Sequence, residues 1–325
     1  MIYRFAKEFI KIKEELEKAR KILLVAHARP DGDTAGSVFA LEEYLSSTLR
    51  KRTDAACLDS CPEYLQELME GKNFVSPSKI NIAQFDLIVG CDAVERSFEK
   101  IVTEKKNNQK IILFDHHPTL ELKNIKADII LRDENYSSVC EILYDFFDFH
   151  RIPINKKIAS LLLTGILSDT AAFQHANTSA KVMEIAATLM RKGAPMNKII
   201  KATLKDKKIE TLKLWGRAME RAEINKKTGA IISFITKEDM KELSIKEDDV
   251  GRIAELLNTV SGTRFSLVLV EKEDNRLKGS LRSEWYKNVD VSEIARNFRG
   301  GGHRLASGFE ITGKLVKRKT GITIE

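Results

Sequence analysis

Carboxylate and histidine side chains, which bind divalent metal ions, gather in four short segments between residues 27 and 169 of this 325-residue chain. Each segment directly follows a run of apolar residues. Oxygen and imidazole donors at several separate positions are typical of a metal centre, and the chemistry that such a centre supports is metal-assisted hydrolysis. In chain order the candidates are His27, Asp31 and Asp33; Asp92; Asp115, His116 and His117; and Asp169.

Charge counting favours a site for two ions. Four carboxylates can balance two divalent cations, so that neither the acids nor the metals would be buried without a partner. Mixed oxygen and imidazole donors suit Mn²⁺ best, with Mg²⁺ as the alternative, and no thiolate directs the site toward zinc. Two such ions can clamp a phosphate group for in-line attack. The six expected metal ligands are His27, Asp31, Asp33, Asp92, His116 and Asp169.

Each segment also has a structural explanation when it is taken alone. An aspartate that follows a strand, such as Asp92, is often a helix cap or a turn residue. Asp31 and Asp33 suit a turn followed by a helix N-cap, and Asp169 suits another cap. Unrelated caps need not gather at one edge of a sheet together with two histidines. The joint pattern therefore favours a metal site.

Strands and helices alternate in the part of the chain that must position these residues. Strands of continuous apolar residues separated by helices predict a parallel sheet covered on both faces. Three of the four segments would then lie just past the carboxyl ends of strands, where ligands of open α/β sheets bind. The predicted strands are residues 21–26, 53–58, 85–91 and 111–114, and the predicted helices between them are 34–49, 63–70 and 93–106.

The pattern becomes helical after residue 137 and changes again near residue 226. Besides an amphipathic first helix with Ile2, Phe5 and Phe9 on its apolar stripe, we predict helices at 137–147, 155–168, 179–192 and 211–222. Strands at 230–236, 264–272 and 276–282, with helices at 247–258 and 291–298, predict a smaller α/β domain. We expect a metal-binding catalytic domain at residues 1–193, a basic helical linker at 194–225 and a substrate-binding domain at 226–325.

The last predicted domain contains three successive glycines. Gly300, Gly301 and Gly302 would expose backbone N–H groups and let a phosphate or a base approach the main chain, with His303 beside them. Arg282, followed by Ser283, offers a guanidinium for a phosphate. The structural alternative for the glycine segment is a flexible surface turn, and that for Arg282 is a surface salt bridge.

Composition narrows the class of protein. Apolar residues make up 43% and charged residues 31%, as in soluble globular proteins, and the longest apolar runs are too short to span a membrane. Acidic residues in the first helix argue against a secretory or transit signal, so we expect a cytoplasmic protein with reduced cysteines. The net charge of +7 suits an anionic partner but is modest. Aromatic residues show no stacking stripe, which argues against a general RNA-binding module.

Together these segments resemble the DHH phosphoesterase family, which is named for the triplet matched here by Asp115-His116-His117. The other motifs occur in the family's order, as His27-x-x-x-Asp31-x-Asp33, Asp92 and Asp169, and the glycine segment with Arg282-Ser283 resembles a DHHA1-type C-terminal domain. The resemblance implies a parallel sheet flanked by helices, a helical linker and a smaller α/β domain. Chain length and the type of the second domain indicate the nano-RNase and pAp-phosphatase (oligoribonuclease) subfamily.

The resemblance also implies a role for each motif residue. His27, Asp31 and Asp92 would hold one Mn²⁺, and Asp33, Asp92, His116 and Asp169 the other, with Asp92 bridging. His117 would face the scissile phosphate, and Asp115 would fix an imidazole tautomer. Arg282, Ser283, Gly300, Gly301, Gly302 and His303 would bind the far end of the nucleotide. The chain departs from the family at Gln174, near a position where members often carry arginine, and at Arg299, where a fourth glycine is common.

The implied activity is hydrolysis of short oligoribonucleotides, 3′ to 5′, to mononucleotides, together with conversion of pAp to AMP. A neighbouring alternative is a phosphodiesterase for cyclic di-AMP or pApA. Two other classes are less well supported. An inorganic pyrophosphatase would not need the glycine segment. A non-catalytic nucleotide sensor would be free to lose metal ligands, whereas all six are present here. The expected partners are short RNA or small nucleotides and no membrane; a homodimer is compatible with the sequence.

Overall fold

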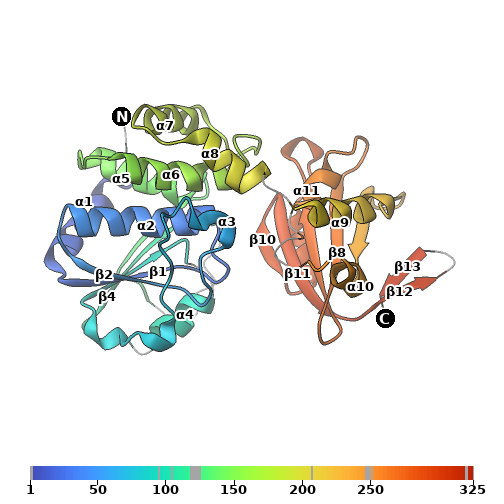
Figure 1. Cartoon of the computed structure of the whole chain (residues 1–325), viewed down its shortest axis with the longest axis horizontal. Coiled ribbons are helices and arrows are strands. Elements are labelled where there is room, and N and C mark those ends of the chain that lie inside the picture. The colour runs from blue at the N-terminus through green and yellow to red at the C-terminus, as the bar shows by residue number, and fades with distance from the viewer. Residues whose placement is uncertain are drawn as a thin grey trace. The chain divides into compact units, whose positions relative to one another are not determined.

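The chain folds into two units, Met1–Asp206 and Lys207–Glu325 (Figure 1). The computed structural model describes residues 3–93, 96–103, 105–117, 126–205, 208–245, 250, 252–318 and 321–324. The segment that we expect to be a linker, 194–225, is divided between the units, because its first helix belongs to unit 1 and its second to unit 2. Ile2 and parts of the predicted helices 93–106 and 247–258 lie outside the described residues.

A five-stranded parallel sheet is the centre of the first unit. Its strand order is β2-β1-β3-β4-β5, which confirms the predicted parallel α/β architecture. The sequence pattern does not predict β5, an edge strand in which only Leu131 is fully buried. The strands are β1 (Lys21–Val25), β2 (Arg52–Ala56), β3 (Leu87–Cys91), β4 (Lys110–Asp115) and β5 (Ile129–Arg132).

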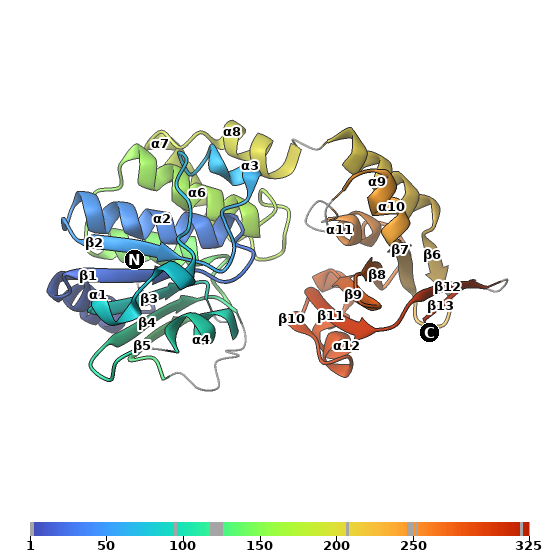
Figure 2. The same cartoon turned by 60° about the horizontal axis from the view of Figure 1, so that its bottom comes forward.

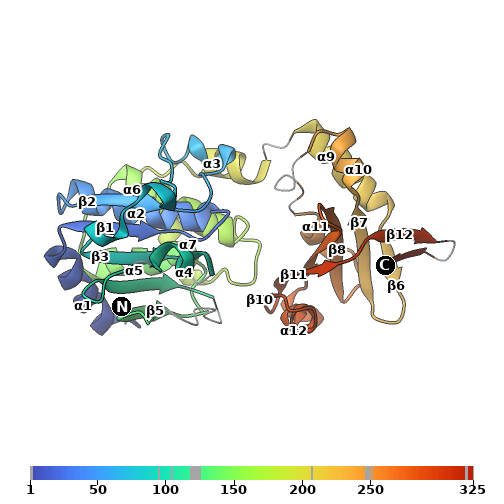
Figure 3. The ribbon, with the colours of Figure 1, turned by 90° about the horizontal axis from the view of Figure 1, so that it is seen from below.

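Helices cover both faces of this sheet because its strands are apolar on both sides. Ile22 and Leu24 of β1 belong to the larger hydrophobic core, which α1, α2, α5, α6 and α7 complete. Leu23 and Val25 point to the opposite face, where α4 packs (Figure 3). The helices are α1 (Ala6–Lys18), α2 (Gly32–Ser47), α3 (Glu63–Gln66), α4 (Arg96–Val102), α5 (Val139–Phe149), α6 (Lys156–Asp169), α7 (Ala180–Arg191) and α8 (Met196–Ile200).

Polar side chains fix the starts of three of these helices. Ser138, Asn155 and Ser179 are the N-caps of α5, α6 and α7, and each side chain accepts a hydrogen bond from the backbone N–H three residues on. Such caps satisfy donors that the helix cannot pair internally and set where the helix begins. The position of α5 matters for the site, because its first turn contacts Asp33.

The second unit contains a six-stranded mixed sheet with the order β10-β11-β9-β8-β7-β6. Only β7 and β8 pair in parallel; the other neighbours are antiparallel. A separate hairpin, β12–β13, follows the sheet. The strands are β6 (Glu223–Asn225), β7 (Ala230–Ile235), β8 (Phe265–Lys272), β9 (Arg276–Arg282), β10 (Gly301–His303), β11 (Ala306–Thr312), β12 (Leu315–Arg318) and β13 (Gly321–Ile324).

Two hydrophobic clusters pack on opposite faces of this sheet. Leu214 of α9 and Ile253 of α11 belong to one cluster, whereas Val291 and Ala295 of α12 belong to the other (Figure 3). Asp239 of α10 is buried and bonded to Arg217 of α9 and to Arg221, the C-cap residue of α9, which joins these two helices. The helices are α9 (Ile209–Glu220), α10 (Lys237–Glu242), α11 (Ile253–Asn258) and α12 (Val291–Asn297).

Neither a membrane span nor a disulfide is found in the described part of the chain. No described helix is both long enough and apolar enough to cross a bilayer. The four cysteines, all of them among the described residues, are buried free thiols.

Candidate metal centre

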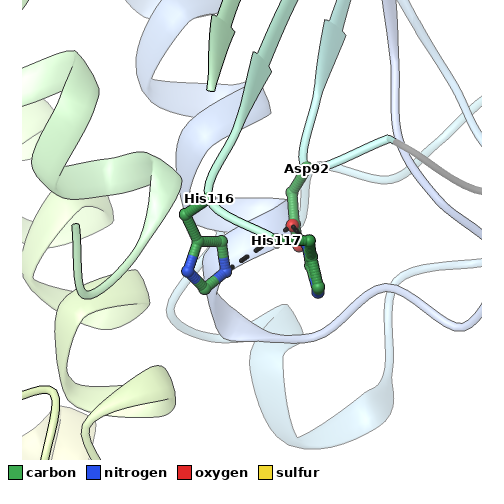
Figure 4. Close-up of side chains that lie close together, drawn as sticks. All are labelled: Asp92, His116 and His117. Carbon is green, nitrogen blue, oxygen red and sulfur yellow. Dashed lines mark ion pairs between the residues drawn. The ribbon is translucent and has the colours of Figure 1, made fainter. Parts of the chain in front are cut away.

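Three neighbouring strands lead to candidate metal-ligating side chains at one edge of the first sheet. β1 ends just before His27, β3 ends just before Asp92, and β4 ends at Asp115, which His116 and His117 follow. Asp169 is the last residue of α6. Figure 4 shows the side chains of Asp92, His116 and His117 converging, with a dashed line for the ion pair of His116 with Asp92.

The structure brings all six expected ligands together. Their donor atoms form three overlapping groups, and within each group the atoms lie within 4.8 Å of one another. The first group is His27, Asp31 and Asp92; the second is Asp33, His116 and Asp169; and the third is Asp92, His116 and His117.

Asp92 lies at the centre of this arrangement. Its Oδ2 is 3.2 Å from Nε2 of His27, while its Oδ1 is 3.3 Å from Nδ1 of His117 and 3.9 Å from Nε2 of His116. The residue adopts a left-handed backbone conformation, with φ of 54°, that few residues other than glycine, asparagine and aspartate tolerate. Oδ1 is buried and accepts no hydrogen bond from the described residues. A buried carboxylate oxygen in that state is suited to a cation.

Asp31 is both a helix cap and a member of a ligand group. Its Oδ1 accepts hydrogen bonds from the backbone N–H groups of Asp33 (2.9 Å) and Thr34 (3.0 Å), which start α2. The observed helix cap is therefore compatible with a metal-ligand role at the same residue, because a carboxylate has two oxygens and several lone pairs.

Thr34 is a site residue that the motif analysis does not single out. Its hydroxyl oxygen lies 2.8 Å from Oδ2 of Asp92, 3.1 Å from Oδ1 of Asp31 and 2.5 Å from Nε2 of His27. The position of a threonine one residue after Asp33 is the only sequence signal, and threonine is too common in first helical turns for that signal to stand out.

Asp33 is fully buried and is held by α5. Its two carboxylate oxygens accept hydrogen bonds from the backbone N–H groups of Val139 (2.7 Å) and Cys140 (2.9 Å). The first turn of a helix carries a partial positive charge, which favours a carboxylate there. Asp33 therefore keeps a fixed orientation before any ion is present.

Asp169 contacts His116 and leads into an unusual turn. Oδ2 of Asp169 is 3.2 Å from Nε2 of His116. The next residues include Ala171, Ala172 and Phe173, which all have positive φ angles between 46° and 70°. Consecutive left-handed residues are strained, and such strain collects at functional sites.

Asp115 lies against His117, which belongs to the third of the ligand groups. Oδ1 of Asp115 accepts a hydrogen bond from the backbone N–H of His117 (2.6 Å) and lies 3.2 Å from Nδ1 of the same residue. Asp115 is fully buried, whereas the side chain of His117 is 36% exposed, against 10% for His116. His117 is therefore the more accessible imidazole of the pair.

Burial and charge crowding perturb the acids of the centre. Burial and the nearby charge of Asp169 raise the pKa of Asp33 well above its usual value, and burial raises the pKa of Asp169 to about 6. Burial opposes ionisation of Asp92 as well, but the hydrogen bond and positive charge of His27 outweigh it and lower the pKa of that carboxyl. Crowded carboxylates of this kind fit divalent cations, which relieve the repulsion among them.

The pKa values of the imidazoles of His27 and His116 are raised. Burial lowers the pKa of His27, but the hydrogen bond and charge of Asp92 outweigh burial and raise it to about 10. Burial likewise opposes protonation of His116, whereas Asp169 raises its pKa well above the usual value. In the metal-free protein these protons supply the positive charge that the carboxylates need.

Glycines let α2 and α6 approach closely beneath the centre (Figure 2). A Cβ atom on Gly36 would lie 2.5 Å from the carbonyl oxygen of Leu161. A Cβ atom on Gly165 would lie 2.3 Å from Sγ of Cys140 and 2.6 Å from Oδ1 of Asp33. The side chain of Asp33 thus lies in space that only glycine at position 165 leaves open.

The expected substrate residues of the second unit lie around β11. Arg282 at the end of β9 and His303 at the end of β10 both pair with Ala306, on opposite sides of β11. The backbone N–H of Ser283 donates a hydrogen bond to the carbonyl of Leu305. The side chain of His303 lies outside the described part of the chain.

Part of the glycine segment is a β-strand rather than the flexible surface turn that is its structural alternative. Gly301 and Gly302 form β10 with His303, and a Cβ on Gly300 would lie 2.2 Å from the carbonyl oxygen of Gly308. Gly302 has a φ of 129°, which favours glycine. Close packing on β11 therefore requires glycine at positions 300 and 302. As β10 is an edge strand, part of its backbone still faces away from the sheet.

Comparison with protein families assigns both units. Residues 21–166 match the DHH family N-terminal domain, and residues 227–320 match the DHHA1 domain. The chain therefore belongs to the DHH family, with a DHHA1 domain as its second unit, and it is a hydrolytic phosphoesterase.

Individual relatives cover most of the chain. The bifunctional oligoribonuclease and PAP phosphatase NrnA of Bacillus subtilis is 28% identical over 296 residues, which is 89% of each chain. The crystal structure of an exopolyphosphatase-related protein from Bacteroides fragilis has a TM-score of 0.85 at 24% identity and covers 95% of this chain and 92% of that one. Exonuclease RecJ bound to manganese has a TM-score of 0.52 at 14% identity, covering 95% and 90%. These two structures support the fold.

Proposed function

We propose that the first unit binds two Mn²⁺ ions and that the protein hydrolyses short oligoribonucleotides from the 3′ end and converts pAp to AMP. The similarity to a relative named for both activities, over 89% of the chain, supports the choice of substrates. The manganese in the RecJ structure, together with the mixed oxygen and imidazole donors, supports the choice of metal.

One observation carries the two-ion proposal: the two oxygens of Asp92 face different ligand groups. Oδ2 lies beside His27, in the group that includes Asp31, and Oδ1 lies beside His116 and His117. We assign His27, Asp31 and Asp92 to one ion and Asp33, Asp92, His116 and Asp169 to the other. The ions would supply Lewis-acid activation of the phosphate and of the attacking water.

Protein side chains then orient the reaction. Asp115 holds His117 through the backbone N–H and lies beside Nδ1, so that the ring keeps one direction. We propose that His117, the more exposed imidazole, donates a hydrogen bond or a proton to the scissile phosphate.

The second unit would bind the far end of the nucleotide. Arg282 donates a hydrogen bond from Nη1 to the carbonyl of Leu281, which fixes part of its guanidinium at the strand end level with His303, the last residue of β10. The proposed set is Arg282, Ser283, Gly300, Gly301, Gly302 and His303. A guanidinium and backbone N–H groups at one strand end suit a phosphate.

A turnover panel tests the substrate proposal. Purified protein with Mn²⁺, Mg²⁺ or Zn²⁺ would be incubated with pAp, pApA, cyclic di-AMP, short RNA, the same sequence as DNA, and pyrophosphate. We expect Mn²⁺ to support hydrolysis of short RNA and pAp, with the Asp92→Asn variant as the inactive control. Turnover of cyclic di-AMP or pyrophosphate alone would overturn the proposal.

A matched pair of arginine variants tests the role of the second unit. Arg282→Ala should raise KM for pAp and pApA about 5- to 150-fold, since charge-assisted contacts contribute about 1–3 kcal/mol. Arg276→Ala, at the other end of β9, should change neither the KM for pAp nor the KM for pApA. Bis-p-nitrophenyl phosphate has no nucleotide group that could reach Arg282, so both variants should hydrolyse it normally. Equal loss of activity on every substrate would show that Arg282 has no selective binding role.

A further inference from the structure

Two aromatic side chains project from the turn after β9. Trp285 is 70% exposed and Tyr286 is 64% exposed, and of the large hydrophobic side chains described these two are the most exposed. Their rings meet edge to face, with centroids 6.0 Å apart. Single exposed apolar residues are common, but two adjacent aromatic rings form a continuous apolar patch, and such patches mark interaction sites.

The turn that carries this aromatic pair is held firmly. Trp285–Lys287 form a short 3-10 helix. The ammonium of Lys287 donates hydrogen bonds to the carbonyl oxygen and Oδ1 of Asn258 and to the hydroxyl of Thr263. The carboxylate of Glu284 accepts a hydrogen bond from the Asn258 amide. A fixed backbone lowers the entropy lost when the rings bind a ligand.

The pair lies at the strand end where the second unit carries its proposed nucleotide-binding residues. Arg282 and Ser283 directly precede the turn, and Ser283 is bonded to Leu305 in the β10–β11 connection. The guanidinium of Arg304, in the same connection, donates a hydrogen bond to Asn288 just after the turn. The turn and the connection are therefore neighbours.

A pocket of about 380 Å³ opens beside Tyr286. Residues 259–264 and Lys287 line the rest of it, and Arg264 there is exposed. That volume lies within the range of small-molecule sites. Arg264 and Arg304 give the surroundings positive charge, while the nearby Glu284 is bonded to Asn258. Aromatic rings next to cations are the combination that binds bases and phosphates of single-stranded nucleic acid.

We propose that Trp285 and Tyr286 stack on nucleobases of single-stranded RNA, and so extend substrate binding beyond the nucleotide held at Arg282. This inference rests on the proposed function. Stacking is tolerant of sequence, because every base has a π-face, so the pair would select for substrate length rather than for base identity. pAp has one base and would gain little from it.

Fluorescence gives a direct test that needs no turnover. The chain has two tryptophans, and Trp215 in α9 is partly buried in the core. A Trp215→Phe variant leaves Trp285 as the reporter, and a chelator prevents hydrolysis during the titration. We expect pentaadenylate RNA to quench the emission saturably and pAp to quench it weakly. Tyr286→Ala in the same background should weaken the binding of the pentamer.

Kinetics with Mn²⁺ complete the test. Trp285→Ala and Tyr286→Ala should each raise KM for the pentamer about 5- to 150-fold, as one lost stacking contact predicts, and leave KM for pAp within about twofold. Tyr64→Ala is the control, since Tyr64 is exposed in the first unit. Unchanged pentamer KM without quenching would overturn the inference while the proposed function stands.

The remaining outcomes are also informative. If neither the unaltered protein nor any variant hydrolyses RNA, the proposed function is wrong. The fluorescence titration with the pentamer then decides by itself whether Trp285 and Tyr286 bind bases. Equal quenching by pAp and the pentamer would reject selection by length. A change of oligomeric state in Trp285→Ala, measured by light scattering, with KM and quenching unaffected, would assign the pair to contacts between protein chains and overturn the inference.

Discussion

The hydroxyl of Thr34 donates a 2.8 Å hydrogen bond to Oδ2 of Asp92, 58 residues further along the chain. The contact joins the first turn of α2 to the end of β3, and the same hydroxyl lies within hydrogen-bond distance of Asp31 and His27. Thr34 therefore holds three of the expected ligands of one ion without being an expected ligand itself.

Replacing this hydroxyl should weaken metal binding. We expect Thr34→Val to lower the affinity for Mn²⁺ about 10- to 100-fold, because partners that orient ligands contribute that much. Thr34→Ser keeps the hydroxyl and should restore most of the affinity. Calorimetric Mn²⁺ titration of the unaltered protein and of these two variants measures the three affinities. If valine and serine behave alike, the hydroxyl has no positioning role.

Loss of the central carboxylate should abolish activity without unfolding the protein. We expect Asp92→Asn to bring turnover below detection and to reduce bound Mn²⁺, because that residue contributes to two ligand groups. Asparagine tolerates the left-handed backbone at this position, whereas alanine adds strain. Metal analysis and thermal unfolding accompany the assay. Near-normal turnover in the asparagine variant would contradict the assigned site.

Removal of the His117 imidazole should reduce catalysis more than metal binding. We expect His117→Ala to lower kcat 10²- to 10⁴-fold while both ions remain bound, as for the loss of a general acid or hydrogen-bond donor. Single-turnover kinetics and metal analysis measure the two effects separately. If one Mn²⁺ is lost instead, His117 is a ligand, as its place in the group with Asp92 and His116 also allows.

Metal affinity and metal-free stability should respond to pH in opposite directions. The pKa of His27 is raised to about 10 in the folded protein, so its ion pair with Asp92 stabilises the metal-free fold below pH ~6.5 and is lost as pH rises through about 10. Mn²⁺ must displace that proton, so its affinity should rise over the same window.

Calorimetric unfolding in chelator and Mn²⁺ titrations from pH 6 to pH 9 measure both trends. The His27→Gln variant is the control, because it carries no titrating imidazole at this position. An Mn²⁺ affinity that does not change with pH would show that no proton leaves His27 when the metal binds.

The glycine contact between α2 and α6 should be intolerant of a single methyl group. Gly165→Ala places Cβ 2.6 Å from Oδ1 of Asp33, so we expect a loss of about 1–3 kcal/mol in unfolding free energy and weaker Mn²⁺ binding. Gly216→Ala is the control: its Cβ meets nothing within 4 Å in α9, and it should stabilise the protein by about 0.5–1 kcal/mol. Denaturant unfolding of both variants is the measurement. Equal effects would show that the contact at Gly165 is not strained.

The sequence predicts the first sheet well because strands buried on both faces are apolar throughout. β5 escapes prediction because it lies at the sheet edge, with a short and half-exposed pattern. The sequence does not predict β10 either, because consecutive glycines are typical of loops. Only the close approach of β11 explains why glycine is needed there. The spacing of carboxylates and histidines in the sequence is enough to propose the metal ligands. The hydrogen bonds of Thr34 and the exposure of Trp285 and Tyr286 are visible only in the structure, because residue spacing does not encode contacts or exposure.

Asp31 and Asp33 are held by backbone N–H groups at the starts of two helices. The conformational freedom of these ligands is therefore lost when the chain folds rather than when an ion arrives. Ions can then enter and leave without refolding, and one divalent ion can replace another. Since the affinities of a given site for first-row divalent ions follow the Irving–Williams order, occupancy would depend on these affinities together with the free concentrations of the competing ions. The metal found in a purified sample will accordingly reflect the medium in which the protein was last equilibrated.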